Sequence, residues 1–99
     1  MGHRIRTAIQ TEFDAGPLRG TGKIRNVDEG GLFVGTEQLP DQGETVRIRF
    51  RAEGTSVDVE GLVWWTTEDA PGPHRARGFG MRLLDDSDAY QRFLSSLSA

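Results

Sequence analysis

The chain contains no cysteine, and this absence excludes disulfide bonds and metal sites built on thiolates. A protein without cysteine fits a reducing compartment, so we expect a cytoplasmic location. Histidine is almost as scarce, since the sequence has only two, His3 and His74. They stand far apart in the sequence and lack the spacing of metal ligands, so no metal site and no cofactor held by one are expected.

Long apolar runs are also missing. No stretch approaches the roughly 20 residues needed to cross a bilayer, so no membrane span is expected. The first four residues lead directly into a polar segment and do not resemble a secretory signal. An enzyme is not expected either, because no histidine lies near a serine-bearing turn and no pair of carboxylates is placed in a pocket by the pattern.

The composition is that of one small globular domain. The chain has 99 residues, of which 35% are hydrophobic and 27% charged, enough for a single core. We therefore expect residues 1–99 to form one domain. The net charge of −3 argues against a general nucleic-acid binder, which normally carries an excess of basic residues.

Alternation with a period of two is the clearest signal of secondary structure. In residues 46–51 apolar side chains alternate with arginines, as in a strand with one buried and one wet face. Weaker patterns of the same kind predict further strands within about residues 5–84, separated by turns that contain glycine or proline. Residues 66–74 are expected to form a loop, since Pro71 and Pro73 cannot extend a central strand.

Two adjacent tryptophans occupy one of these predicted strands. Neighbouring residues of a strand point to opposite faces, so one ring is expected inside and the other outside. Trp65 continues the odd-numbered phase of Val57, Val59 and Val63 and is expected in the core. Trp64 is then either covered by the C-terminal helix or exposed as an anchor for a protein partner.

The C-terminal residues change to a helical period. Large apolar residues recur at i, i+3, i+4 and i+7, which predicts an amphipathic helix of about residues 87–97. The preceding run Asp85-Asp86-Ser87-Asp88 is typical of a helix N-terminus. Several short antiparallel strands followed by one helix indicate an all-β fold, a six-stranded antiparallel β-barrel with one C-terminal α-helix packed on an end of the sheet.

A polar turn lies between two predicted strands, in residues 24–34. Its segment Asn26-x-Asp28-x-x-Gly31 resembles the [D/N]-x-S-x-x-G signature of PilZ domains, the bacterial receptors for cyclic di-GMP. The segments Gly61-Leu62-Val63-Trp64-Trp65 and 78–83 are similar to later strands of that family, in the same order. This resemblance implies a PilZ-like barrel and a role in second-messenger signalling, for example in the regulation of motility.

The resemblance also implies where a ligand would bind. The family binds cyclic di-GMP with an R-x-x-x-R pair before the first strand and with the signature turn, which places the ligand-binding residues of this chain at Arg4, Arg6, Asn26, Asp28 and Gly31. The arginine pair is incomplete, because Arg4 and Arg6 do not have the four-residue spacing. Asp28 stands where the family has serine, and an ionised carboxylate accepts hydrogen bonds but cannot donate one.

Three functions follow from these observations. The first is a PilZ-type regulatory module that acts through protein contacts and binds cyclic di-GMP weakly or not at all. The second is a working cyclic di-GMP receptor. The third is a small nucleic-acid-binding barrel that uses Lys23, Arg25 and the arginine stripe of residues 47–51. We define this arginine stripe as Arg47, Arg49 and Arg51. It is either a solvated face paired with Asp58 and Glu60 on the next strand or, together with Trp64, a docking surface for a partner.

Overall fold

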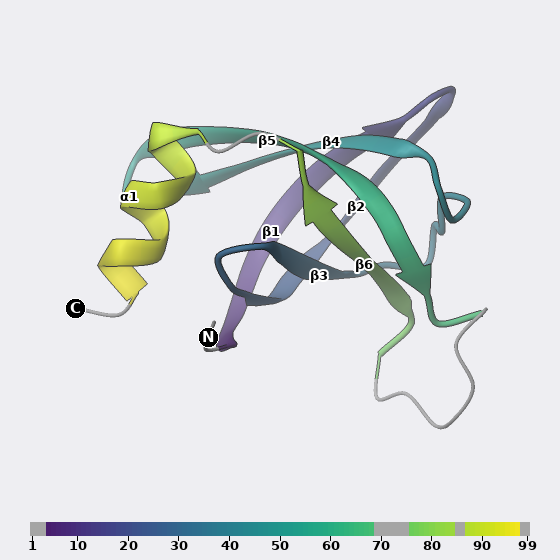
Figure 1. Cartoon of the computed structure of the whole chain (residues 1–99), viewed down its shortest axis with the longest axis horizontal. Coiled ribbons are helices and arrows are strands. Elements are labelled where there is room, and N and C mark those ends of the chain that lie inside the picture. The colour runs from purple at the N-terminus through teal and green to yellow at the C-terminus, as the bar shows by residue number, and fades with distance from the viewer. Residues whose placement is uncertain (1–3, 69–75, 85–86, 98–99) are drawn as a thin grey trace.

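A computed structural model describes residues 4–68, 76–84 and 87–97 of the chain. The described residues form six strands and one helix, in the order β1 (Ile5–Ala15), β2 (Leu18–Val27), β3 (Gly31–Gly35), β4 (Thr45–Ala52), β5 (Thr55–Thr66), β6 (Gly78–Leu83) and α1 (Asp88–Leu97) (Figure 1). His3 and His74 lie outside the described residues. Within the described part of the chain, no helix has the length and apolar character that a membrane crossing requires.

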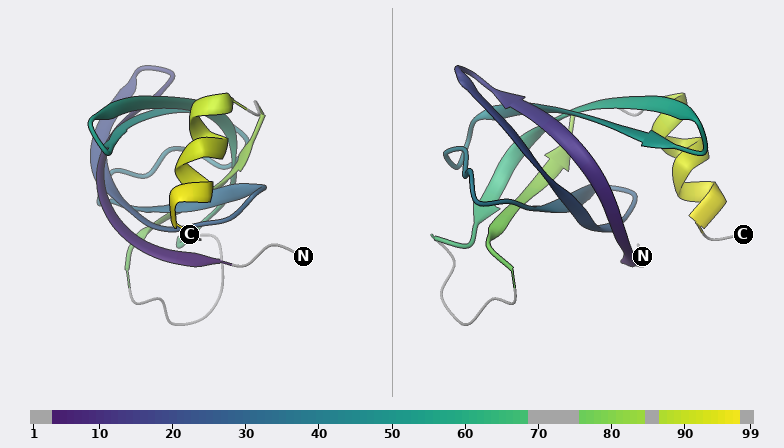
Figure 2. Two further views of the ribbon diagram at one scale, coloured as in Figure 1. Left: turned by 90° about the vertical axis from the view of Figure 1, so that its left-hand side faces the viewer. Right: turned by 180° about the vertical axis from the view of Figure 1, so that it is seen from behind.

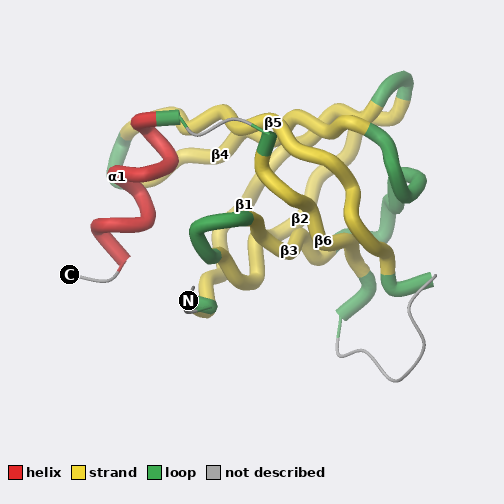
Figure 3. The backbone as a smooth tube through the Cα atoms, in the orientation of Figure 1, coloured by secondary structure: helices red, strands yellow, loops and turns green. Residues whose placement is uncertain are grey.

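The six strands close into an antiparallel barrel with the neighbour order β1-β2-β3-β6-β5-β4. Figure 3 shows the strands curling around a common centre, with the helix outside them at one end. The alternation predicted for residues 46–51 is present, because the even-numbered residues of β4 are buried and its arginines are exposed. The predicted fold class, a six-stranded antiparallel barrel with one C-terminal helix, is confirmed.

The C-terminal helix lies across one end of the barrel (Figure 2). Its N-terminus is capped by Ser87, whose hydroxyl accepts a hydrogen bond from the backbone N–H of Tyr90 at 3.1 Å. The apolar face of the helix turns toward the core, where the ring of Phe93 packs edge-on against Phe50 of β4 with centroids 4.9 Å apart. Tyr90 is completely buried beside it. The helix therefore completes the core that the strands enclose.

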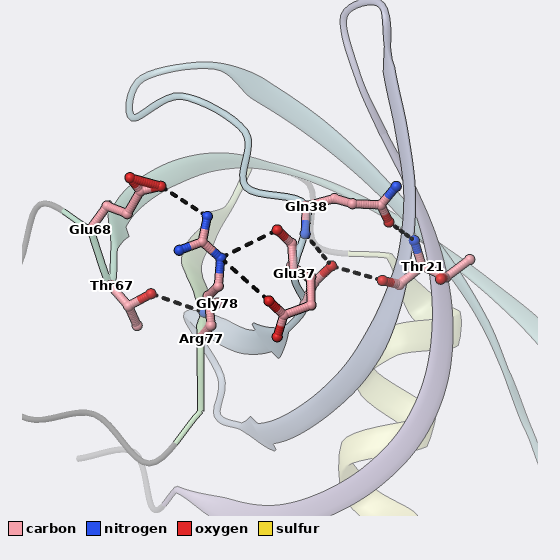
Figure 4. A network of polar contacts seen from close by, with 8 residues as sticks. Thr21, Glu37, Gln38, Thr67, Glu68, Arg77 and Gly78 are labelled. Carbon is pink, nitrogen blue, oxygen red and sulfur yellow. Dashed lines mark hydrogen bonds and ion pairs between the residues drawn. The ribbon is translucent and has the colours of Figure 1, made fainter.

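Loops at the opposite end of the barrel are joined by one arginine (Figure 4). Arg77, just before β6, donates to the carbonyl oxygen of Glu37 at 3.3 Å and to the carboxylate of Glu68 at 3.0 Å. The backbone carbonyl of Arg77 also accepts a hydrogen bond from the N–H of Thr36 at 2.8 Å. Arg77 thereby ties the segment after β3 to the end of β5.

A β-bulge in β5 overturns one expectation about the tryptophans. Val63 lies opposite Met81 of β6, but Trp65 lies opposite Gly80, so Trp64 is an extra residue between the two pairs. The bulge reverses the alternation, and Trp65 lies on the outer face with Phe33 and outside the main core. Expecting Trp65 in the core was wrong, because a uniform period of two contains no bulge.

Candidate functional site

The turn between β2 and β3 is held by the carboxylate of Asp28. One carboxylate oxygen, Oδ1, accepts hydrogen bonds from the backbone N–H groups of Gly30 and Gly31 at 2.8 and 2.9 Å. The backbone N–H of Asp28 donates in turn to the carbonyl oxygen of Gly31 at 2.9 Å. Both the side chain and the backbone of Asp28 therefore form the hydrogen bonds that close this turn. The bond that its carboxylate accepts from the N–H two residues later is the one that defines an Asx turn.

The second carboxylate oxygen of Asp28 faces Arg4. The Nε of Arg4 lies 3.7 Å from Oδ2, and the Nη1 of the same guanidinium donates to the side-chain oxygen of Asn26 at 2.7 Å. Arg6 lies directly opposite Asn26 in the pairing of β1 with β2. The structure thus brings together all five residues predicted for the ligand site.

The β2–β3 turn needs glycine at position 31 because a side chain would not fit there, and not because the backbone adopts a conformation reserved for glycine. A Cβ atom at this position would run into the carbonyl oxygen of Met81 on the neighbouring β6. The close approach of β3 and β6 at this point leaves no room for a side chain. The glycine that fits the family signature is therefore also a packing requirement of the barrel.

The turn is also connected to the C-terminal helix. The buried hydroxyl of Tyr90 donates to the carbonyl oxygen of Asp28 at 2.9 Å and lies 3.4 Å from that of Gly31. Burial, and secondarily the negative charge of Asp28, raises the pKa of Tyr90 well above its ordinary value near 10. The helical period placed Tyr90 on the buried face, but nothing in the sequence indicated its contact with a turn 62 residues away.

An open groove lies on the outer face next to the turn. It has a volume of about 530 Å³, and we call it the arginine groove. Its floor is aromatic, because the rings of Phe33 and Trp65 stack with centroids 5.4 Å apart and an interplanar angle of 25°. The groove is lined by Arg4, Arg6, Thr7, Arg25, Asn26, Phe33, Trp65 and Ala76. Sequence reasoning missed Phe33 and Trp65 here, since only the bulge brings Trp65 to this face.

A sequence profile of the PilZ domain matches residues 2–99. The chain belongs to the PilZ domain family. PilZ domains are regulatory modules, and the family includes receptors for cyclic di-GMP. A comparison with curated proteins found no match.

Solved structures support the fold of this PilZ domain. It is similar to the Bacillus subtilis inhibitor of motility MotI/DgrA, with a TM-score of 0.77 and 14% identity, over 99% of this chain and 49% of that one. The chain therefore spans about half the length of MotI/DgrA. It is also similar to the PilZ domain of CeSA from a cellulose-synthesizing bacterium, with a TM-score of 0.68 and 18% identity, over 97% and 95% of the two chains.

The arginine stripe of this PilZ domain lies on another part of the barrel, and two of its three arginines are paired with carboxylates. Arg49 donates to Asp58 at 2.8 Å, and Arg47 lies 3.9 Å from Glu60. This pairing, chiefly the hydrogen bond that Arg49 donates to Asp58, raises the pKa of Arg49 further. On its other side the stripe meets acidic residues of β1, with Glu12 opposite Arg49 and Asp14 opposite Arg47. Arg51 donates to the carbonyl oxygen of Gly54 at 3.0 Å.

The basic residues of the nucleic-acid hypothesis do not form one surface. Lys23 and Arg25 belong to β2, whereas the arginine stripe belongs to β4, and β1 lies between these two strands in the barrel. The acidic residues of β1 and β5 flank the stripe on both sides. This alternation of charges weakens the attraction of the stripe for a polyanion, which requires a concentrated positive potential.

Proposed function

We propose that this PilZ domain is a regulatory module that acts through protein contacts and binds cyclic di-GMP weakly or not at all. One observation carries the proposal, namely that the turn is already occupied by its own anion. The carboxylate of Asp28 takes the backbone N–H groups of Gly30 and Gly31 and lies near the guanidinium of Arg4. Two backbone N–H groups and an arginine are the kinds of donors that bind a phosphate.

Electrostatics opposes a phosphate at the same place. Two like charges about 4 Å apart repel by roughly 1 kcal/mol in water and by about 4 kcal/mol at an effective dielectric constant near 20. A ligand phosphate would also have to compete with Asp28 for Arg4, and one charge-assisted hydrogen bond is worth about 1.5–3 kcal/mol. Since about 1.4 kcal/mol changes affinity tenfold, these costs move a micromolar ligand toward millimolar binding.

The arginine groove favours a second candidate, a working receptor for cyclic di-GMP. Arg6 and Arg25 line this groove beside the stacked rings of Phe33 and Trp65. Arginines and aromatic rings together suit a ligand that carries both phosphates and purine bases. In this candidate the groove residues hold the ligand despite the negative charge of Asp28.

Calorimetric titration with cyclic di-GMP separates the two candidates. We expect no measurable binding of the unchanged protein at micromolar concentrations, and a gain of affinity of at least about tenfold in Asp28→Ser. Asp58→Ser is the matched control, because it removes a carboxylate that pairs with the arginine stripe and leaves the β2–β3 turn intact. Micromolar binding by the unchanged protein would overturn the proposal in favour of the receptor. The name of the structural neighbour MotI/DgrA makes motility the first process in which to test the protein's role.

A further inference from the structure

The outer face of β5 and β6 carries an exposed apolar surface, the tryptophan patch, which we define as Leu62, Trp64, Arg82 and Leu84. Trp64 and Leu84 are 50% and 57% exposed, and they are the exposed large apolar side chains of the described residues. Leu62 lies directly opposite Arg82 in the pairing of the two strands. The backbone N–H of Leu84 bonds to the carbonyl of Glu60 at 2.9 Å, which places Leu84 next to the same part of β5.

Arg82 gives this apolar patch a positive charge. Its guanidinium carbon lies 4.3 Å from the centroid of the Trp64 ring, a cation–π contact that holds the two side chains together. Among the described residues, no carboxylate lies within ion-pair distance of Arg82, in contrast to Arg47 and Arg49. The nearby Glu60 is engaged by Arg47 at 3.9 Å. Arg82 is therefore available to bind a carboxylate from another molecule.

A cavity adjoins the patch and gives a bound side chain a place to enter. It has a volume of about 320 Å³ and lies between the tryptophans and the β2–β3 turn. Arg4 and Arg82 both line it, together with Asp28 and the two glycines of the turn, Gly30 and Gly31. Because Arg4 already faces the carboxylate of Asp28 at 3.7 Å, Arg82 is the guanidinium that remains for an acidic group, and the tryptophan rings beside it suit an apolar one.

We propose that the tryptophan patch docks a segment of a protein partner that presents apolar side chains beside an aspartate or glutamate. This inference rests on the proposed function, in which the domain acts through protein contacts. Tryptophan and arginine are the residues that most often dominate binding energy at interfaces, and here they are already held in contact. A symmetric pairing of two copies is disfavoured, because it would bring two Arg82 side chains together without an acidic partner in the patch.

Selection of peptides tests this inference on the unchanged protein. A phage-displayed library of random short peptides is selected on the full chain, and the winners are synthesised and titrated by calorimetry. We expect winners that carry leucine or an aromatic residue next to an acidic residue. Their affinity should fall at least about tenfold in Trp64→Ala and in Arg82→Gln. Arg51→Gln is the matched control, since it removes an exposed arginine from the far stripe and should leave the affinity unchanged.

A double-mutant cycle sharpens the result. Changing the acidic residue of a winning peptide to its amide should weaken binding to the unchanged protein but not to Arg82→Gln. The inference is overturned if the peptides lack acidic residues, if no peptide is selected, or if binding survives both patch variants. It is also overturned if sedimentation shows a dimer that Trp64→Ala abolishes, because the patch would then bind a second copy.

The two proposals can fail separately. Peptides that bind but ignore the patch variants would leave a protein-contact function standing and show that the surface is wrong. Micromolar binding of cyclic di-GMP to the unchanged protein would overturn the proposed function, whatever the peptides show. Trp64→Ala and Arg82→Gln change exposed side chains, so the circular dichroism and thermal unfolding of both variants should match those of the unchanged protein.

Discussion

The β2–β3 turn and the arginine stripe both pair acidic residues with arginines, yet they differ in what the acidic residues support. Asp28 in the turn is 24% exposed and satisfies two backbone N–H groups in addition to facing Arg4. Asp58 beside the stripe is 52% exposed and bonds only to the guanidinium of Arg49 among the described residues. A carboxylate that satisfies the backbone shapes the fold, whereas an exposed ion pair competes with water and contributes little.

The strongest way to break the turn is to fill the space at Gly31. We expect Gly31→Ala to lower the free energy of unfolding by about 2–3 kcal/mol, because the new Cβ would collide with the Met81 carbonyl and force β3 and β6 apart. Chemical denaturation measures the loss. Gly30→Ala is the matched control, since the nearest atom to its new Cβ is Asp28 Oδ1 at 3.8 Å, an ordinary contact. Equal losses in the two variants would contradict this account of Gly31.

The second largest effect is expected from removing the hydrogen bond of Tyr90, which connects α1 to the β2–β3 turn. We expect Tyr90→Phe to cost about 1–2 kcal/mol, since it removes the hydroxyl donor from the carbonyl of Asp28 while the ring still fills its place. The carbonyl of Gly31 keeps the backbone N–H of Asp28 as its donor. Denaturation in urea measures the change. If Tyr90→Phe is as stable as the unchanged protein, the hydroxyl adds nothing beyond the packing of its ring.

The raised pKa of Tyr90 predicts a dependence on pH. The unfolded chain releases the phenolic proton near pH 10, while the folded protein keeps it to higher pH. Stability from this group is therefore complete below about pH 10 and is lost as the pH rises above that value. Tyr90 is the sole tyrosine in the sequence, so tyrosinate absorbance reports it directly. Ionisation of the folded protein near pH 10 would contradict the buried hydrogen bond.

The smallest effects compare the two carboxylates directly. We expect Asp28→Ala to lower the free energy of unfolding by about 1 kcal/mol, because two backbone N–H groups lose their acceptor. Asp58→Ala should leave the denaturation midpoint nearly unchanged and should reduce the salt dependence of stability, because one exposed ion pair of the stripe is lost. The comparison fails if Asp58→Ala is the more damaging substitution.

Most of the barrel could be predicted from the sequence, because local periods encode it. The alternation in residues 46–51 and the i, i+3, i+4 pattern of α1 depend only on which side chains face the core. The position of Trp65 could not be predicted, because the bulge at Trp64 depends on pairing with β6. The same limit applies to the site. The signature residues were found from their spacing, but the Tyr90 contact and the stacked floor of the groove depend on the closed barrel.

The hydrogen bond from Tyr90 also makes the turn and the helix thermodynamically linked. Linkage is reciprocal, so whatever favours the present shape of the turn favours the seating of α1 to the same extent, and the reverse holds as well. The coupling free energy between the turn and α1 cannot exceed the free energy that the hydrogen bond of Tyr90 contributes. If the hydroxyl contributes about 1.4 kcal/mol, an event at one element can shift the equilibrium of the other about tenfold. A coupling of this size shifts the position of the helix gradually and is too small for an all-or-none switch.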